Sequence, residues 1–233
     1  HVPTVHPLFA AKQAATIDNI SAGRFGLNVV CGWFRPEIEM FGVEQLPHEL
    51  RYGMADEWLT VIKRAWTEQD FDYEGRHYRI KGGFLLPKPV QQPHPVLINA
   101  GNSEEGRDFS ARNVDFNFVT MATKEQASSM VNDIRERARG YGRHCGVMSY
   151  GLVCCRDTEA EARALYDSIV AQGDWDAVHN IMNLLGMESS SFNEQIKSFG
   201  ERFIAGWGGY PLVGTPAQVV DMMVELNGLG IEG

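Results

Sequence analysis

The sequence predicts an α/β fold in which parallel strands are covered by helices. Mostly apolar runs too short for helices alternate with amphipathic segments of ten or more residues, and these runs lie at residues 24–31, 96–100, 115–120 and 149–155. Continuous apolarity is typical of strands that are buried on both faces of a parallel sheet. A doubly wound sheet and a (β/α)8 barrel both satisfy the pattern. Because no GxGxxG motif follows any of the four runs, the barrel is favoured.

The first third of the chain alternates helix, strand and helix. Alanine and isoleucine recur at helical spacing over residues 10–20, and Gly23 follows as a stop signal. The strand at residues 24–31 ends at Gly32. A loop with two prolines then leads to a long amphipathic helix over residues 49–67.

The rest of the chain continues the alternation with one excursion and one insertion. Residues 72–80 are typical of a small hairpin. A glycine turn connects the strand at 96–100 to a helix beginning at Glu104. Thr158 and Glu161 form a capping box, which predicts a helix start. Further helices are expected at residues 124–141, 158–172, 174–186, 191–204 and 216–229, and partial strands at residues 1–5 and 230–233. The helices at about residues 158–211 are interpreted as an insertion.

Charge and cysteine content narrow the classes of function. The chain carries 21 Lys and Arg against 30 Asp and Glu, a net charge of −9 at pH 7, which disfavours a nucleic-acid partner. No apolar run approaches the roughly 20 residues that cross a bilayer, and no secretion signal opens the sequence. The four cysteines lack disulfide-framework and zinc-site spacing. We therefore expect a cytoplasmic protein with reduced thiols, no metal site and no membrane partner.

The turn at residues 100–106 is the most informative candidate site. Gly101 permits a close backbone approach, Ser103 offers a hydroxyl, and the following helix start offers N–H groups and a positive dipole end. Such a turn can hold a phosphate, but it can equally be an ordinary turn capped by Ser103. Glu104 and Glu105 suit the helix dipole and would repel a phosphate if they faced it.

Four further residues are candidates for ligand contact. Asn28 is an amide in an apolar run, so it either braces backbone or faces a ligand. Glu37 lies in the loop after that strand, where barrel enzymes keep functional groups, but it can also be a solvated charge. Arg51 and Tyr52 open the long helix and offer a cation and a phenol to a phosphate or a planar ring. They can also form a salt bridge and a core contact.

Several motifs in order resemble the bacterial luciferase-like flavin monooxygenases. Residues 15–33 read ATIDNISAGRFGLNVVCGW, and they are followed by Glu37, by Glu-Leu-Arg-Tyr at residues 49–52, and by Pro-Lys-Pro. Ala-Gly-Asn-Ser and an Asp-Phe-Asn-Phe strand come next. The series is similar to the branch that contains the pyrimidine oxygenases and the dimethylsulfone and alkanesulfonate monooxygenases.

This resemblance implies a luciferase-like (β/α)8 TIM barrel with a helical insertion after its seventh strand. It implies a two-component flavin-dependent monooxygenase, in which a separate NAD(P)H-dependent flavin reductase supplies reduced FMN and O2 oxygenates a small pyrimidine, sulfone or sulfonate. It also implies flavin contacts at Asn28, Glu37, Arg51, Tyr52 and Ser103, with the phosphate near Ser103 and Arg51–Tyr52 and the ring near Asn28. We add Gly101 to the predicted cofactor-binding residues, because it allows a close backbone approach at the same turn. A deazaflavin (F420)-dependent oxidoreductase and a non-catalytic flavin-binding protein are the alternatives.

The sequence also departs from this family. Tyr150 and Leu152 stand where alkanesulfonate enzymes carry an Arg and a His, which disfavours a sulfonate substrate, and Cys31 replaces a Ser or Thr. Residues 1–233 are predicted to be one partial barrel domain, from the end of the third strand to the start of the eighth, and therefore truncated at both ends. Such a segment expressed alone is expected to aggregate or stay partly unfolded. The complete enzyme is expected to be a homodimer or homotetramer.

Overall fold

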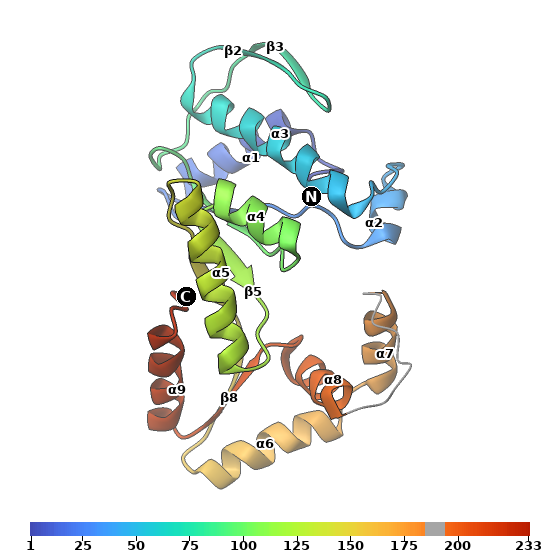
Figure 1. Ribbon diagram of the computed structural model, residues 1–233, viewed down its shortest axis with the longest axis vertical. Helices are drawn as coiled ribbons and strands as arrows, with labels where there is room; N and C mark the ends of the chain where they lie inside the picture. The colour runs from blue at the N-terminus through green and yellow to red at the C-terminus, as the bar shows by residue number, and fades with distance from the viewer. Residues whose placement is uncertain (185–193) are drawn as a thin grey trace. The chain divides into compact units, whose positions relative to one another are not determined.

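The computed structural model describes residues 1–184 and 194–233, and it divides into two compact units (Figure 1). Unit 1 comprises His1–Phe118 and Ile134–Cys145, and unit 2 comprises Val119–Asp133 and Gly146–Gly233. The first half of the chain contains, in order, α1 (Pro7–Ile20), β1 (Gly26–Asn28), α2 (Arg35–Met40), α3 (His48–Thr67), β2 (Phe71–Glu74), β3 (Arg79–Gly83), β4 (Val96–Asn99), α4 (Glu104–Asn113) and β5 (Phe116–Val119). After these come α5 (Lys124–Gly140), β6 (Gly146–Ser149), β7 (Gly151–Cys155), α6 (Glu159–Ala171), α7 (Trp175–Leu184), α8 (Glu194–Gly206), β8 (Tyr210–Gly214) and α9 (Pro216–Gly228).

Unit 1 is built on a parallel sheet in which β4 lies between β1 and β5. Leu27 of β1 is in register with Leu97 of β4, and Ile98 of β4 with Phe116 of β5. Helices connect these strands, as parallel pairing requires. The predicted α/β class with parallel strands is therefore confirmed.

The sheet of unit 1 is buried on one face, and the expectation of burial on both faces was wrong. Leu97 and Asn99 of β4 and Asn117 of β5 are buried, whereas the alternate positions of these strands are half-buried. On β1 the alternate residue Asn28 is exposed. The apolar run at 24–31 therefore does not mark a strand that is buried on both faces within the described residues.

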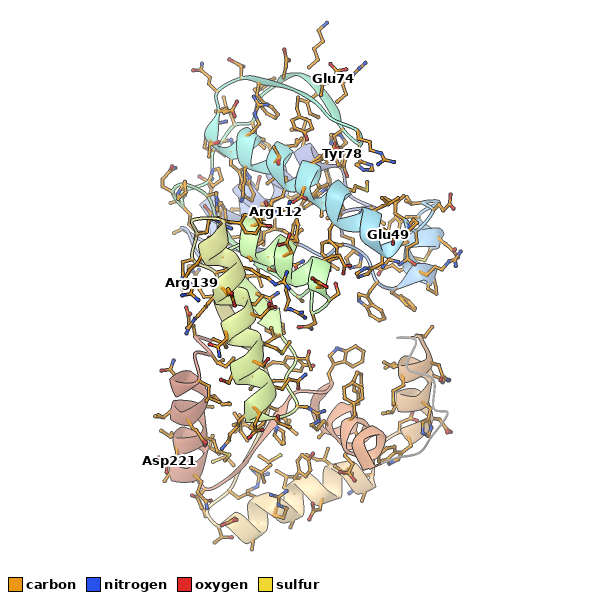
Figure 2. All side chains as sticks on the ribbon, viewed as in Figure 1. Glu49, Glu74, Tyr78, Arg112, Arg139 and Asp221 are labelled. Atoms are coloured by element: carbon orange, nitrogen blue, oxygen red, sulfur yellow. The ribbon has the colours of Figure 1, made fainter. Side chains whose placement is uncertain are left out.

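Helices α1, α3 and α4 pack together over the buried face (Figure 1). Trp66 of α3 donates its indole N–H to the carbonyl of Ala11 in α1 at 3.0 Å. Arg112 of α4, labelled in Figure 2, bonds Asp56 of α3 at 2.9 Å. Phe109 of α4 is fully buried, and its ring packs against Tyr52 of α3. The predicted helices at residues 10–20 and 49–67 are confirmed within three residues at each end.

The predicted hairpin is present as β2 and β3, which pair antiparallel. Its turn is tied to α3 by Glu57, whose carboxylate accepts the backbone N–H groups of Arg76 and His77, both at 2.9 Å, and of Tyr78 at 3.2 Å. Figure 2 labels Glu74 and Tyr78 on the two sides of this turn. Because one carboxylate satisfies three backbone donors, the excursion is fixed at a defined place on α3.

In unit 2 the strand predicted at residues 149–155 is present as β7, and a separate strand, β6, ends at Ser149, with Tyr150 as the break between the two. β7 pairs in parallel with β8, with Val153 in register with Leu212. β6 instead bonds the last residues of the chain, since Val147 accepts from the Glu232 amide at 2.8 Å and Ser149 donates to Gly233 at 2.9 Å. The sequence had not predicted β8, and neither residues 230–233 nor residues 1–5 form an assigned strand.

Helices α6, α7 and α8 lie between β7 and β8 in the chain, in the range of residues where helices were predicted. Thr158 caps α6 with the reciprocal bonds of a capping box, as predicted, and Thr215 caps α9 in the same way. The predicted helices at residues 174–186 and 191–204 are present as α7 and α8. Their residues 185–186 and 191–193 lie outside the described part of the chain.

For the expected absence of a membrane span, a metal site and disulfides, the structure can be read only over the described residues. There, no helix combines the length and apolarity needed to span a membrane, and no group of three His, Cys, Asp or Glu side chains is arranged to hold a metal ion. All four cysteines are free thiols.

Candidate functional site

The turn between β4 and α4 is capped as the sequence predicts. Ser103 is the N-cap of α4, and its hydroxyl accepts the amide of Gly106 at 3.1 Å. Its carbonyl accepts the amide of Arg107 at 2.9 Å. The capping interpretation of Ser103 is therefore correct, and the helix start presents its positive dipole end beside this hydroxyl.

Two glycines allow the turn to fold tightly against the helix that follows it. A Cβ atom on Gly101 would lie 2.7 Å from Gly106 Cα, 2.7 Å from Asn99 Oδ1 and 2.7 Å from the Tyr52 hydroxyl. A Cβ on Gly106 would lie 2.6 Å from that hydroxyl and 2.7 Å from Gly101 Cα. Both positions therefore need glycine because of close approach. Gly101 was identified from the sequence for this reason, but Gly106 was not.

Tyr52 of α3 brings a second hydroxyl to the turn. Its hydroxyl is hydrogen-bonded to the Ser103 side chain, and its ring packs against Phe109 at a centroid distance of 5.6 Å. Burial is the main cause that raises the pKa of Tyr52, so the phenol stays protonated at neutral pH and can donate a hydrogen bond. Tyr52, Gly101 and Ser103 are thus brought together although they lie about 50 residues apart in the chain.

Arg51 lies beside this cluster but directs its guanidinium to a loop. Its Nε donates to the Leu46 carbonyl at 2.7 Å and its Nη1 to the Gly32 carbonyl at 3.1 Å. Arg51 therefore joins the two ends of the segment that leads from β1 to α3. It also lines a cavity of about 10 Å³ together with Cys31. Burial, followed by the charge of Asp56, raises the pKa of Cys31 to about 12, so this thiol is neutral.

Glu105 occupies the helix start where an external anion would bind. Its carboxylate accepts its own backbone N–H and the Ser103 hydroxyl, and these two bonds lower its pKa. His48 Nδ1 lies 3.6 Å from Glu105 Oε2. The sequence had left open whether this acidic residue faces the turn, and the structure shows that it does.

Asn28 and Glu37 differ from their expected settings. Asn28 is exposed at the end of β1, although it belongs to an apolar run. Glu37 lies in the first turn of α2 and not in a loop, because Pro36 stands at an early helix position that tolerates proline. Its Oε2 lies 3.4 Å from His1 Nδ1. Among the described residues, neither side chain is hydrogen-bonded or ion-paired to the turn at residues 101–106.

Three buried polar residues behind the turn were missed at the sequence level. Asn99, Ser110 and Asn117 are each at most 2% exposed and are bonded to one another. Asn99 accepts the Gly101 amide at 2.9 Å, and Asn117 donates to the Gly101 carbonyl at 3.2 Å. The signal was available, because Asn99 and Asn117 are amides in apolar strands, the same feature that had singled out Asn28.

The sequence profile of one family, the luciferase-like monooxygenases, matches residues 1–233. The chain belongs to this family. An FMNH2-dependent dimethylsulfone monooxygenase of Pseudomonas putida is 34% identical over 232 residues, which cover 97% of this chain and 64% of that protein. The pyrimidine monooxygenase RutA of Variovorax paradoxus is 34% identical over 178 residues, which cover 74% of this chain and 47% of that protein. The chain thus spans less than two thirds of these relatives.

Solved structures of luciferase-like enzymes share the fold. A long-chain alkane monooxygenase superposes with a TM-score of 0.86 at 25% identity, covering 98% of this chain and 61% of that one. DmoA from Hyphomicrobium sulfonivorans superposes with a TM-score of 0.84 at 23% identity, covering 99% of this chain and 60% of that one. This chain therefore has the α/β fold of the luciferase-like TIM-barrel structures.

Tyr150 and Leu152, the two positions at which the sequence is expected to depart from the alkanesulfonate enzymes, lie at the junction of β6 and β7. Tyr150 separates the two strands, and its hydroxyl donates to the Trp207 carbonyl. Leu152 is half-buried on β7. Neither side chain carries a charge that would attract a sulfonate.

Proposed function

We propose that this chain belongs to a two-component monooxygenase that binds reduced FMN and uses O2 to oxygenate a small organic substrate. The observation that carries the proposal is the glycine turn at the start of α4, where the Ser103 and Tyr52 hydroxyls meet. A helix start with two hydroxyl donors suits a phosphate monoester such as that of FMN. The homologous dimethylsulfone monooxygenases are FMNH2-dependent.

The residues of unit 1 fit the phosphate end of a flavin. Gly101 keeps side-chain atoms away from the turn, and Ser103 and Tyr52 donate to the phosphate. Arg51 acts through the loop that it holds, and Asn28 and Glu37 are assigned to the ring end, which the resemblance implies. Reduced flavin supplies the electrons that activate O2, and the protein binds it, orients it and excludes water. Such an enzyme needs no catalytic triad.

Glu105 must leave the helix start when a phosphate enters. Its carboxylate makes the two bonds that a phosphate oxygen would make, with its own amide and with Ser103. The side chain is half exposed, so it has room to rotate into solvent. The negative charge held there supports the proposal of an anion at this turn, and the same carboxylate competes with the anion of the ligand.

A sulfone or a pyrimidine is the substrate class that the relatives favour, since relatives acting on each are 34% identical to this chain. An alkanesulfonate is disfavoured because Tyr150 and Leu152 are uncharged. We also propose a flavin reductase partner and a homo-oligomeric state. The strands of this chain are assigned to a TIM barrel, from the end of its third strand to the start of its eighth, and α6–α8 are assigned to the insertion after the seventh strand. The length of the relatives and the position of α6–α8 between β7 and β8 support that assignment.

The test is an oxygenation assay with the intact protein. Flavin reductase, NADH, FMN and 18O2 are supplied with dimethylsulfone, uracil or a short alkanesulfonate, and the products are analysed by mass spectrometry. Because free reduced FMN itself consumes O2, the readout is product that carries 18O. Labelled product from one substrate, reduced at least tenfold in Ser103→Ala, supports the proposal. Product with reduced F420 and without O2 would favour a deazaflavin oxidoreductase, and flavin binding without any product would favour a flavin carrier.

A further inference from the structure

Behind the glycine turn lies a cluster of buried polar side chains that the proposed flavin contacts do not include. Asn99 ends β4, Asn117 lies on β5, and Ser110 lies on α4. Asn117 and Ser110 are 0% exposed and Asn99 is 2% exposed. Polar side chains are seldom buried this completely unless their hydrogen bonds fix a particular conformation.

The cluster holds the Gly101 peptide from both sides. Asn99 Oδ1 accepts the Gly101 amide at 2.9 Å, and Asn117 Nδ2 donates to the Gly101 carbonyl at 3.2 Å. Asn99 Nδ2 also donates to the Val29 carbonyl at 2.7 Å, which ties the turn to the end of β1. The turn is therefore fixed to two strands of the sheet and not only to its own helix.

Ser110 connects the two amides to the first turn of α4. Its hydroxyl lies 2.9 Å from Asn99 Oδ1 and 2.9 Å from the Gly106 carbonyl, and it accepts from Asn117 Nδ2 at 2.9 Å. Gly101 and Gly106, whose Cα atoms must stay close, are thus bound to the same buried hydroxyl network. A movement of either glycine would break several of these bonds together.

The orientation of Asn117 indicates what the cluster is optimised for. Its two amide hydrogens face three oxygen atoms, those of the Asn99 and Gly101 carbonyls and of Ser110. Its Oδ1 is buried without a hydrogen-bond partner among the described residues. Rotating the amide by 180° would place Oδ1 against those three oxygens. The network therefore keeps the amide hydrogens of Asn117 directed at the turn, although its Oδ1 stays without a hydrogen bond in the described part of the chain.

We propose that Asn99, Ser110 and Asn117 are positioning residues that hold the turn at Gly101–Gly106 in the shape that selects a phosphate-bearing flavin over its dephosphorylated form. This inference rests on the proposed function, because it assumes that the phosphate of FMN binds at this turn. The three side chains lie behind the turn and act through Gly101 and Gly106. Their loss should affect recognition of the phosphate and leave recognition of the flavin ring unchanged.

The test compares dissociation constants for reduced FMN and reduced riboflavin, measured anaerobically on the intact protein. Ser110→Ala removes the central hydroxyl with little change in volume, and Asn117→Asp replaces the donor with an acceptor that faces carbonyl oxygens. We expect each variant to weaken FMN binding at least tenfold and to change riboflavin binding less than twofold. The matched control is Asn113→Asp, which places a carboxylate beside Asp56 at the other end of α4. This control should lower the melting temperature and leave the ratio of the two constants unchanged.

The outcomes separate this inference from the proposed function. A folded Ser110→Ala protein with an unchanged FMN-to-riboflavin ratio would overturn the inference alone. Equal loss of both ligands in Ser110→Ala and in the control would also overturn it, since the residues would then be merely structural. A wild-type protein that binds FMN and riboflavin equally would show that the phosphate is not recognised at this turn. A wild-type protein that binds neither would refute the proposed function itself.

Discussion

Substituting Gly101 by alanine tests the packing of the candidate site most sharply. The new Cβ would meet Gly106 Cα, Asn99 Oδ1 and the Tyr52 hydroxyl, each at 2.7 Å, whereas ordinary contacts begin at 3.4 Å. These atoms must therefore retreat by about 0.7 Å, and all three are held by hydrogen bonds or by the start of α4. Overpacking of this kind costs about 1–3 kcal/mol.

The same displacement should weaken flavin binding as well as the fold. Moving the start of α4 away from Tyr52 and Ser103 removes at least one charge-assisted hydrogen bond to a phosphate, worth about 1.5–3 kcal/mol. That loss corresponds to at least a tenfold increase in the dissociation constant for FMN. Anaerobic differential scanning fluorimetry with and without reduced FMN measures both effects. We expect a melting temperature a few °C lower and little stabilisation by FMN.

Gly53 provides the matched control for this substitution. It lies next to Tyr52 within α3, and a Cβ there would have no atom within 4 Å. Gly53→Ala should stabilise the protein by about 0.5–1 kcal/mol, because alanine favours the helix, and should leave FMN binding unchanged. The reasoning would be refuted if Gly101→Ala melted like the wild type and bound FMN within twofold of it.

Three further predictions follow from individual side chains. Glu105→Gln should tighten FMN binding several-fold without affecting riboflavin binding, because it removes the competing charge. The control is Glu104→Gln, which lies in the same helical turn beside Arg137. Both variants are titrated with both flavins, and equal FMN affinities of the two variants would contradict the prediction. Arg51→Lys should weaken FMN and riboflavin equally, since lysine can reach only one of the two carbonyls that Arg51 bonds; selective loss of FMN would instead indicate direct phosphate contact. Burial raises the pKa of the fully buried Asp18, but hydrogen bonds from Gln91 and Val90 outweigh burial and lower this pKa below 3.8. The ionised carboxylate therefore stabilises the folded protein fully well above pH 3.8, and this stabilisation is lost as the pH falls through the lowered pKa. Asp18→Asn should lower the free energy of unfolding by about 1–3 kcal/mol at pH 7. In urea titrations it should also reduce the loss of stability at acid pH, and an unchanged loss would contradict the prediction.

Local signals in the sequence predicted the parts of the structure that depend on neighbouring residues. Ser103 caps α4 and Thr158 caps α6 as expected, because a capping bond spans three residues and its partners are visible in the sequence. The hairpin and the main helices follow from composition and periodicity in the same way. These features needed no knowledge of which elements touch.

The parts that depend on distant contacts could not be predicted in the same way. Asn28 belongs to an apolar run, yet it is exposed, because the side of β1 on which it lies is decided by which helices cover the sheet. Tyr52 meets Gly106 through the packing of α3 on α4, across more than 50 residues. The break at Tyr150 arises because β6 and β7 take different pairing partners. In each case the deciding partner is remote in sequence.

The central claim is that reduced FMN binds with its phosphate at the turn between β4 and α4. It is tested most directly by anaerobic titration of the intact protein with reduced FMN, alongside the variants Ser103→Ala and Tyr52→Phe. Each variant removes one of the two hydroxyls that are hydrogen-bonded to each other at the turn. The account predicts micromolar binding by the wild type and binding at least tenfold weaker in each variant. Absence of micromolar binding, or equal affinity in all three proteins, would contradict it.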